Sequence, residues 1–349
     1  MRILITGGAG FVGSSLAGLY RTKYPQAQIV VFDNLKRRGS ELNIPRLKSW
    51  NVEFCHGDIR SQTDFGALSQ KSFDLFIEAS ADPSVVVGAK GDSAQYAIQT
   101  NLFGTVNCLE FARQHCGAFL FLSTSRVYSL PELLKIPLQE GKTRLDPEPL
   151  FRGISETFST KGVRSFYGTT KLSSEMLIEE YVYAYQLKAL INRCSVICGP
   201  WQMGKVDQGV FSLWMVRHFL GGNLEYTGFG GKGFQVRDLL HPEDLFKLLE
   251  LQFEKNQNWA GQVYNVGGGF KNSISLCELT RLCQQLTGKE LNIGSAASTH
   301  KTDVPYYVTN HSLVEKDFQW QPTVSVKEIM EQVLYWLKSH RAELEVVFP

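Results

Sequence analysis

A tyrosine and a lysine at helical spacing could act together in proton transfer. Tyr167 and Lys171 are four residues apart, which places them on one face of a helix. A phenol titrates near ~10, so a tyrosine needs help to act as a base at neutral pH. The Lys171 ammonium would stabilise the phenolate, and the hydroxyls of Ser123, Thr124 and Ser125 could hydrogen-bond a substrate oxygen nearby. The alternative is a surface Tyr/Lys pair and an ordinary turn.

The segment Gly7-Gly8-Ala9-Gly10-Phe11-Val12-Gly13 has the glycine spacing of a dinucleotide-binding turn. It satisfies G-x-x-G-x-x-G and, from Gly8, also G-x-G-x-x-G, between an apolar run and a helical pattern. Glycines permit a tight turn and close approach of a pyrophosphate, which then lies at the positive end of the helix. A purely structural glycine turn is possible, but the position between strand and helix favours dinucleotide binding.

The choice of dinucleotide depends on Asp33, which ends the second apolar run, 20 positions after Gly13 (33 − 13). A carboxylate there can hold both hydroxyls of the adenosine ribose and would repel a 2′-phosphate, so we expect NAD rather than NADP. The basic run at positions 36–38 could accept that phosphate, but a solvated surface run also accounts for it. Asp58 and Ile59 follow the third run and could contact the adenine, although Asp58 also suits an ordinary β-to-α turn.

The elements that must position these residues alternate along the first two-thirds of the chain. Short apolar runs, separated by longer helical patterns, predict a parallel sheet with right-handed crossover helices, which is a doubly wound α/β fold of the Rossmann type. We expect strands at Arg2–Thr6, Ile29–Phe32, Val52–Cys55, Asp74–Ala79, Ala118–Ser123 and Lys188–Ile197. We expect helices at Phe11–Lys23, Ala94–His115 and Phe166–Tyr185.

The alternation stops after Gly199-Pro200. Residues 204–233 predict loops around one helix, followed by a strand at Gln235–Leu240, a helix beginning near Pro242, a strand at Val263–Val266, and helices near 275–286 and 325–338. We expect residues 1–200 and 235–268 to form the NAD-binding Rossmann domain. Residues 201–234 and 269–349 would form a smaller, discontinuous substrate lobe.

Composition excludes several classes of protein. The chain has 349 residues, 43% of them hydrophobic and 20% charged, as in ordinary globular enzymes. Its 36 basic and 34 acidic residues give a net charge of +2, which argues against nucleic acid as a partner. No run is long and apolar enough to predict membrane insertion. The seven cysteines show no C-x-x-C pair or clustered histidines, so we expect a cytoplasmic protein with reduced thiols and no metal.

In this order, the glycine turn, the strand-end hydroxyls and Y-x-x-x-K resemble the extended short-chain dehydrogenase/reductase superfamily of NAD-dependent epimerases and dehydratases. More narrowly, several segments resemble the CDP-tyvelose (CDP-paratose) 2-epimerases. These are Asp33-Asn34-Leu35-Lys36-Arg37-Arg38-Gly39-Ser40, Gly199-Pro200-Trp201-Gln202, Asp207-Gln208-Gly209, Gln235-Val236-Arg237-Asp238 and, in the tail, Asp303-Val304-Pro305-Tyr306-Tyr307 and Phe318-Gln319-Trp320-Gln321-Pro322. The resemblance covers essentially the whole chain and implies a role in polysaccharide or O-antigen biosynthesis.

The resemblance also implies roles for individual residues. Tyr167 would be the acid/base, Lys171 its activator and a ribose ligand, and Thr124 the hydroxyl that orients the sugar. The implied cofactor-binding residues are Gly7, Gly10, Phe11, Val12, Asp33, Asn34, Asp58, Ile59, Ala79, Ala81, Asn101, Ser123, Tyr167 and Lys171. The implied substrate-binding residues are Ser125, Arg126, Ser195, Gln208 and Arg237.

Two of these roles have alternatives. Asn101 would brace the active-site helix, or it could be an ordinary polar residue inside a helix. Arg237 offers a guanidinium fork suited to a nucleotide diphosphate. A structural salt bridge of Arg237 with Asp238 or Asp244 is the alternative.

The residues after Thr124 narrow the reaction. The resemblance implies Asp-Glu there in sugar 4,6-dehydratases, as the acid and base that expel water, and a Glu at the second position in decarboxylases. Here the pair is Ser125-Arg126, which disfavours both reactions. The 2-epimerases usually have Asn-Lys, so Ser125 departs from their pattern, as does Ser129, where a glycine is common.

We therefore expect an NAD-dependent epimerase of a nucleotide-diphosphate sugar, with a CDP-sugar favoured. The sugar would be oxidised to a ketosugar, rotate about its diphosphate linkage, and be reduced on the other face, which regenerates NAD. A 4-epimerase or a reductase on the same scaffold is the alternative, and an inactive NAD-binding scaffold is a third reading. The helices at 94–115 and 166–185 carry surplus apolar residues, and the resemblance implies a homodimer or homotetramer through them, although burial within one chain also explains these residues.

Overall fold

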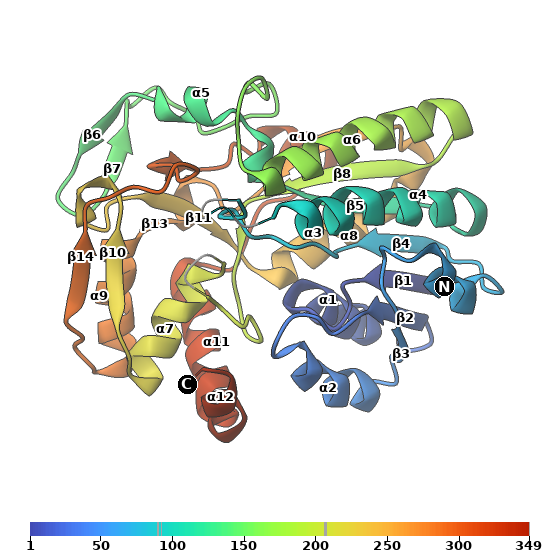
Figure 1. Ribbon diagram of the computed structural model, residues 1–349, viewed down its shortest axis with the longest axis horizontal. Helices are drawn as coiled ribbons and strands as arrows, with labels where there is room; N and C mark the ends of the chain where they lie inside the picture. The colour runs from blue at the N-terminus through green and yellow to red at the C-terminus, as the bar shows by residue number, and fades with distance from the viewer. Residues whose placement is uncertain (89–90, 92, 206–207, 349) are drawn as a thin grey trace.

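A parallel sheet forms the centre of the molecule. The computed structural model describes residues 1–88, 91, 93–205 and 208–348, so Asp207, named above, lies outside the described residues. Within these residues the sheet has seven strands in the order β12-β8-β5-β4-β1-β2-β3 (Figure 1). The strands are β1 (Arg2–Thr6), β2 (Gln28–Asp33), β3 (Glu53–His56), β4 (Leu75–Glu78), β5 (Phe119–Thr124), β8 (Ala189–Cys194) and β12 (Gln262–Val266).

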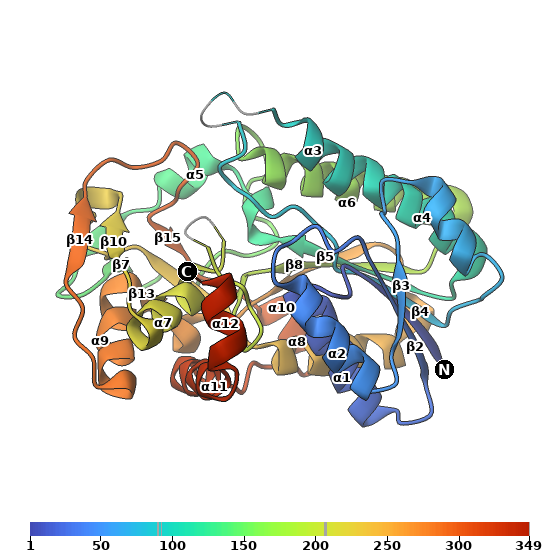
Figure 2. The same ribbon diagram turned by 60° about the horizontal axis from the view of Figure 1, so that its bottom comes forward.

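Helices cover both faces of this sheet, which confirms the predicted doubly wound α/β fold (Figure 2). Buried side chains of β1 and β2 that point to one face pack against α1, α2, α8 and α10. Those that point to the other face pack against α4 and α6. Strands covered on both faces must be apolar throughout, which explains the continuous runs in the sequence. The helices are α1 (Phe11–Lys23), α2 (Asn43–Ser49), α3 (Gln95–Ile98), α4 (Gly104–His115), α6 (Phe166–Tyr185), α8 (Pro242–Glu254) and α10 (Ser312–Phe318).

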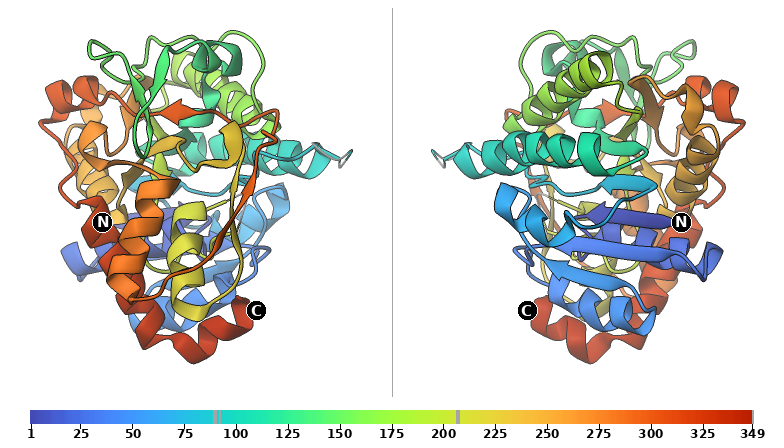
Figure 3. Two further views of the ribbon diagram at one scale, coloured as in Figure 1. Left: turned by 90° about the vertical axis from the view of Figure 1, so that its left-hand side faces the viewer. Right: turned by 90° about the vertical axis from the view of Figure 1, so that its right-hand side faces the viewer.

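A smaller lobe lies beside the sheet, on the left in Figure 1, and side views show it against the sheet's edge (Figure 3). Its hydrophobic cluster joins helices α7, α9, α11 and α12. In the described residues, β10 pairs with β14, β6 pairs with β7, and β11 pairs with β9, β13 and β15. The bounds are α5 (Leu130–Leu134), β6 (Leu138–Glu140), β7 (Leu145–Pro147), β9 (Val196–Ile197), α7 (Val210–Leu220), β10 (Leu224–Thr227), β11 (Val236–Leu240), β13 (Ser273–Ser275), α9 (Leu276–Thr287), β14 (Ile293–Ala296), β15 (Tyr306–Tyr307), α11 (Val326–Ser339) and α12 (Arg341–Val347).

The structure corrects two predicted elements. The strand predicted over Lys188–Ile197 is wrong in its last three residues, because β8 ends at Cys194 and β9 then pairs with Leu239 and Leu240 of β11 in the smaller sheet. The helix predicted over Ala94–His115 is interrupted by one π-helical turn at Gln99–Phe103, a local widening that often occurs at functional sites.

The strands of segment 235–268, which was assigned as a whole to the NAD-binding domain, belong to two different sheets. β12 joins the large sheet, whereas β11, from the same segment 235–268, joins the smaller one. The division into an NAD-binding domain and a substrate lobe stays a proposal. Within the described residues, no helix could cross a membrane, and no group of three or more His, Cys, Asp and Glu side chains could hold a metal ion.

Candidate active site

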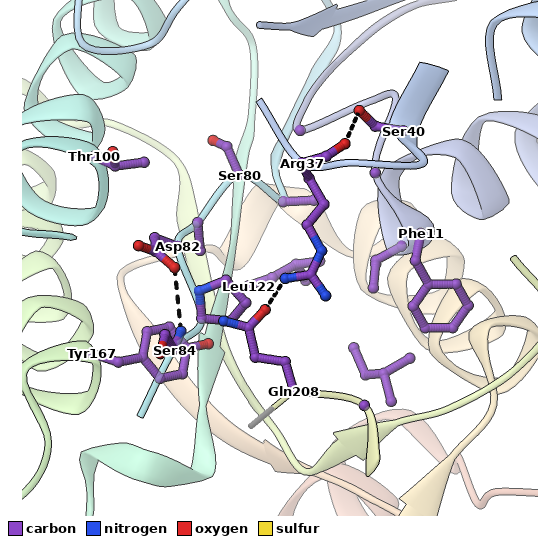
Figure 4. Close-up of a pocket in the computed structure, with 18 of the residues that line it drawn as sticks. Phe11, Arg37, Ser40, Ser80, Asp82, Ser84, Thr100, Leu122, Tyr167 and Gln208 are labelled. Carbon is purple, nitrogen blue, oxygen red and sulfur yellow. Dashed lines mark hydrogen bonds between the residues drawn. The ribbon is translucent and has the colours of Figure 1, made fainter. Parts of the chain in front are cut away.

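A cavity of about 810 Å³ lies at the carboxyl ends of β1, β2, β4 and β5 (Figure 4). This is the edge where open α/β sheets bind their ligands. It collects most of the predicted site residues from segments far apart in the sequence. Those that line it are Gly7, Gly10, Phe11, Val12, Asp33, Asn34, Ile59, Ala79, Ala81, Ser123, Thr124, Ser125, Arg126, Tyr167, Ser195 and Gln208. Asp58, Asn101, Lys171 and Arg237 are not among the residues that line it.

The glycine turn between β1 and α1 leaves room for a pyrophosphate. Gly7 has a φ of +65°, and a Cβ there would lie 2.7 Å from the Ala79 carbonyl oxygen. A Cβ at Gly13 would lie 2.3 Å from the Gly7 carbonyl oxygen, so the turn and the helix can meet only through glycine. α1 begins after Gly10, and the cavity reaches this N-terminus. The cradle therefore fits a dinucleotide whose phosphates lie on backbone amides.

Asp33 is held at the end of β2 by two backbone amides. Its carboxylate accepts from Ala9 N at 3.1 Å and from Leu35 N at 2.8 Å. Burial raises the pKa of Asp33, while these hydrogen bonds oppose the rise. The carboxylate thus ties the glycine turn to β2 and faces the cavity where a ribose would lie.

Asp58 does not line the cavity but contacts Asn34, which does. It accepts from Asn34 Nδ2 at 2.8 Å and forms a salt bridge with Arg60 at 2.6 Å. Partial burial alone would raise the pKa of Asp58, but the hydrogen bonds from Arg60 and Asn34 lower it to about 2. The Arg60 guanidinium also lies 4.8 Å from the centroid of the Tyr96 ring, and Tyr96 lines the cavity. The predicted contact of Asp58 with the adenine stays a prediction.

Tyr167 and Thr124 meet at the opposite end of the cavity. Thr124 ends β5, and its hydroxyl accepts from Arg126 N at 3.2 Å. Tyr167 lies in the first turn of α6, whose N-cap Ser165 accepts from Gly168 N at 3.1 Å. The close approach of α6 to β5 requires Gly168, because a Cβ there would lie 2.0 Å from the Arg126 carbonyl oxygen.

The surroundings of Tyr167 raise the pKa of its phenol, so neighbouring groups must lower that pKa for it to act as a base. Burial raises the pKa of Tyr167 to about 12, while a hydrogen bond with Thr124 and the charge of Arg126 lower it. A base for neutral pH needs a lower pKa than this, so further positive charge is required. Lys171 lies one turn along α6, where it is buried, with Nζ 3.8 Å from the centroid of the Phe121 ring.

Asn101 lies in the π-helical turn and contacts α6. Its side chain donates to the Thr170 hydroxyl at 3.3 Å and exchanges hydrogen bonds with the backbone of Asp82. Its carbonyl oxygen accepts from the Ser174 hydroxyl at 3.0 Å. These contacts agree with the expected bracing of the helix, but Asn101 does not reach the cavity. Its role toward a cofactor stays a prediction.

The predicted substrate residues differ in their surroundings. Ser195 lines the cavity, and within the described residues its buried hydroxyl has no hydrogen-bond partner. Gln208 also lines the cavity and accepts a hydrogen bond from Arg37, which crosses from the loop after β2 (Figure 4). Arg37 further donates to the Met203 carbonyl at 2.8 Å.

Arg237 is buried and is not among the residues that line the cavity. Its guanidinium forms a salt bridge with Asp303 at 2.9 Å and donates to the carbonyls of Val236 and Val304. A structural salt bridge is thus present, although with Asp303 rather than with Asp238 or Asp244. The predicted contact with a diphosphate stays a prediction.

Sequence reasoning did not name four charged residues that line the cavity as site residues: Lys36, Arg37, Asp82 and Lys205. Lys36 and Arg37 belong to the basic run for which the sequence leaves two interpretations, contact with a 2′-phosphate and a solvated surface. Asp82 follows β4 in the loop at the carboxyl edge, and its charge raises the pKa of Tyr167. Its position after an apolar strand was a usable signal, because the carboxyl ends of parallel strands share one edge.

Comparison with known proteins decides the family. The family model described as "NAD dependent epimerase/dehydratase family" matches residues 3–267. The chain belongs to this family. Its membership confirms NAD as the cofactor and confirms the predicted superfamily.

Several members of the family are similar over nearly their full length. The chain is 30% identical to CDP-paratose 2-epimerase of Salmonella typhi, over 97% of this chain and 100% of that protein. A Bacillus cereus UDP-glucuronic acid 4-epimerase, solved with UDP-glucuronic acid and NAD, has a TM-score of 0.80 at 25% identity and covers 97% of this chain and 99% of its own. A Bacillus anthracis dTDP-glucose 4,6-dehydratase in complex with NAD has a TM-score of 0.78 at 25% identity, with 99% of both chains covered. The chain is therefore an enzyme of the nucleotide-sugar epimerase and dehydratase type.

Proposed function

We propose that this enzyme is an epimerase of a CDP-linked sugar that inverts one carbon through a transient ketosugar. The observation that carries the proposal is the wall of the cavity beside Tyr167. There Thr124 is followed by Ser125 and Arg126, and all three line the cavity. A dehydratase needs an acid and a base at this place to expel water across two carbons. The similarity to CDP-paratose 2-epimerase supports the choice of a CDP-sugar.

The chain's own residues divide the work as follows. NAD, when bound on the glycine turn, supplies the hydride acceptor and donor. Tyr167 takes the proton of a sugar hydroxyl at its phenolic oxygen and later returns it. Thr124 orients that hydroxyl by hydrogen bonding, and Lys171 supplies the positive charge that makes the phenol acidic enough.

Substrate positioning falls to the polar groups around the rest of the cavity. The unpartnered Ser195 hydroxyl is available to a substrate oxygen. The Arg126 guanidinium, which donates to the Thr302 carbonyl at 3.4 Å, adds positive charge near the phenol. Together with Gln208 these groups give the cavity a polar wall suited to a sugar and its diphosphate.

The decisive experiment is incubation of the purified protein with CDP-, dTDP- and UDP-sugars without added reductant, followed by product NMR. We expect an epimerised CDP-sugar, and we expect denatured protein to release NAD(H). Inversion at C4 of a UDP-sugar would assign a 4-epimerase, and NADH that accumulates with oxidised product would assign a dehydrogenase. No conversion of any sugar, with NAD still bound, would favour an inactive scaffold.

We also propose that the enzyme forms a homodimer or homotetramer through α4 and α6. Large apolar side chains remain exposed on or next to these helices: Phe103 is 58% exposed, Met176 61% and Tyr183 83%. Light scattering of the purified protein gives the mass directly, and a monomer at micromolar concentration would contradict this proposal.

A further inference from the structure

Two acidic and two basic side chains are buried behind the cavity wall: Glu78, Glu175, Lys171 and Arg193. Arg193 and Glu175 neutralise each other's charge. Arg193 lies 2.6 Å from Glu175 in a salt bridge, and its Nε donates to both carboxylate oxygens of Glu175 at 3.1 Å. Ser123 also donates to Glu175. The charge of Glu175 is therefore compensated. The other two groups are Lys171 and Glu78.

Strand register places Glu78 near the Lys171 ammonium, without a direct salt bridge between the two groups. Glu78 of β4 pairs with Phe121 of β5, and paired residues of neighbouring strands project from the same face, about 4.8 Å apart. The Lys171 Nζ lies 3.8 Å from the centroid of that Phe121 ring. Glu78 is 0% exposed and Lys171 1% exposed, so water does not screen their charges. Glu78 accepts from Thr105 of α4, and Lys171 projects from α6; these two helices lie above the sheet in Figure 1.

The hydrogen bonds of Glu78 satisfy only one of its two carboxylate oxygens and do not compensate its negative charge. Its Oε1 accepts from the Thr105 hydroxyl at 2.6 Å. Its Oε2 is buried and accepts no hydrogen bond from the described residues. An ionised carboxylate in an apolar interior is costly unless an opposite charge faces it, and the same holds for the ammonium. Each group therefore supplies what the other lacks.

We propose that Glu78 is a positioning residue of the active site whose carboxylate is the buried counter-charge that keeps Lys171 protonated behind Tyr167. This inference rests on the proposed function only in giving Lys171 the task of activating Tyr167. Glu78 touches neither the cavity nor the phenol and acts through the lysine. No proton or electron has to leave the pair during the reaction.

The charges around the pair agree with this role. Burial lowers the pKa of Lys171, and among the groups that raise it Glu78 has the largest effect, followed by Glu175, Cys194 and Cys108. Burial raises the pKa of the Cys194 thiol to about 12 and that of Cys108 well above its usual range, so both thiols are neutral near pH 7. Burial also raises the pKa of Glu78 to about 7, and Lys171 opposes this rise.

The test is to titrate Lys171 itself in the NAD-bound protein, without substrate. The protein carries ¹³C-labelled lysine, and the signal of Lys171 is assigned by its loss in Lys171→Met. In Glu78→Gln we expect its titration midpoint to fall by about one pH unit or more, because the amide keeps the shape but removes the counter-charge. Glu78→Asp, which retains the charge, should restore most of the shift. Glu179→Gln, on the exposed side of α6, removes an equal charge and should have no effect.

An unchanged Lys171 midpoint in folded, NAD-bound Glu78→Gln overturns the proposal. If Glu78→Gln does not fold, ¹³C-glutamate labelling of the unsubstituted protein provides a second measurement. The ionisation of Glu78, assigned through Glu78→Asp, must then appear as a step in the Lys171 signal, as coupled sites require, and independent titrations overturn the proposal. Because no substrate is present, failure here is distinct from failure to find epimerase activity.

Discussion

At the scale of single residues, the surroundings of Tyr167 disfavour the deprotonation of its phenol that the proposed reaction requires. Burial raises its pKa to about 12, so the phenol depends on the groups that stabilise its anion. A hydrogen bond with Thr124 and the charge of Arg126 lower that pKa, and we propose that Lys171 adds positive charge from one turn along α6. In this proposal the pKa of the Tyr167 phenol is lowered by several separate interactions with its oxygen atom.

Removing that oxygen is the first test. In Tyr167→Phe we expect kcat to fall by roughly 10²–10⁴-fold or more, the usual contribution of a general acid or base. The fold and the bound NAD should persist, because the pyrophosphate lies on the glycine turn rather than on the phenol. Turnover and NAD content are measured in the same sample, with Tyr183→Phe, an exposed tyrosine of the same helix, as the control. Near-normal kcat at full NAD content would place the acid/base elsewhere.

We propose that Asp33 sets the preference for NAD through its charge. Asp33→Asn keeps one of the two oxygens that accept from the backbone amides of the turn, but the charge that would repel a 2′-phosphate is lost. We expect weaker NAD binding and a smaller gap between NAD and NADP, measured by calorimetry on the apoprotein. Asp74→Asn, at the opposite end of the strands, is the control. Unchanged affinities for both dinucleotides would show that Asp33 does not contact the ribose.

At the scale of elements, the site depends on how closely α6 approaches the end of β5. The two elements meet at Gly168, where a Cβ would overlap the Arg126 carbonyl. This contact fixes the height of Tyr167 above Thr124. Neither the helix nor the strand alone determines that distance.

Gly168→Ala tests this contact. We expect α6 to move away from β5, with a loss of roughly 1–3 kcal/mol of stability, as for other overpacked sites. Because Tyr167 moves with the helix, kcat should fall by more than the loss of folded protein explains. Thermal unfolding and kcat are compared with those of Thr169→Ala, the exposed next residue. Equal kcat in the two variants would show that the spacing of helix and strand is not critical.

At the scale of the whole molecule, Asp238 of β11 connects the smaller sheet to the loop after β12. It is completely buried and accepts from Gly269 N at 3.0 Å. Burial raises its pKa to about 6, well above the value of about 3.9 in an unfolded chain. The folded protein thus binds the proton more tightly than the unfolded chain. As the pH rises from about 4 through 6, ionisation of Asp238 lowers the stability.

Asp238→Asn should remove that part of the pH dependence. The expected gain at pH 7–8, relative to pH 4, is on the order of 2–3 kcal/mol. Chemical denaturation at several pH values, with Asp74→Asn as the exposed control, measures the difference. Parallel pH curves for the variant and the unsubstituted protein would contradict the assignment.

The sequence predicted most of the large sheet and the cavity, because both depend on local signals. The apolar run at β1, the glycine turn and the spacing of Tyr167 and Lys171 are all readable within a few residues. The break after Cys194 was not readable, because the apolar run continues while Val196 and Ile197 pair with a distant strand. The salt-bridge partner of Arg237 was also missed, since Asp303 comes from a remote segment. Long-range partners of this kind leave no periodic pattern.

The order of strands in the large sheet also has a consequence for synthesis. β8 lies between β5 and β12, so one of its edges stays unpaired until β12 has been made. At about 5–20 residues per second, residues 195–261 take roughly 3–13 s to translate. During that interval an apolar strand edge is open to pairing with another nascent chain. Slow synonymous codons in this stretch should therefore lower the yield of native protein without altering its stability.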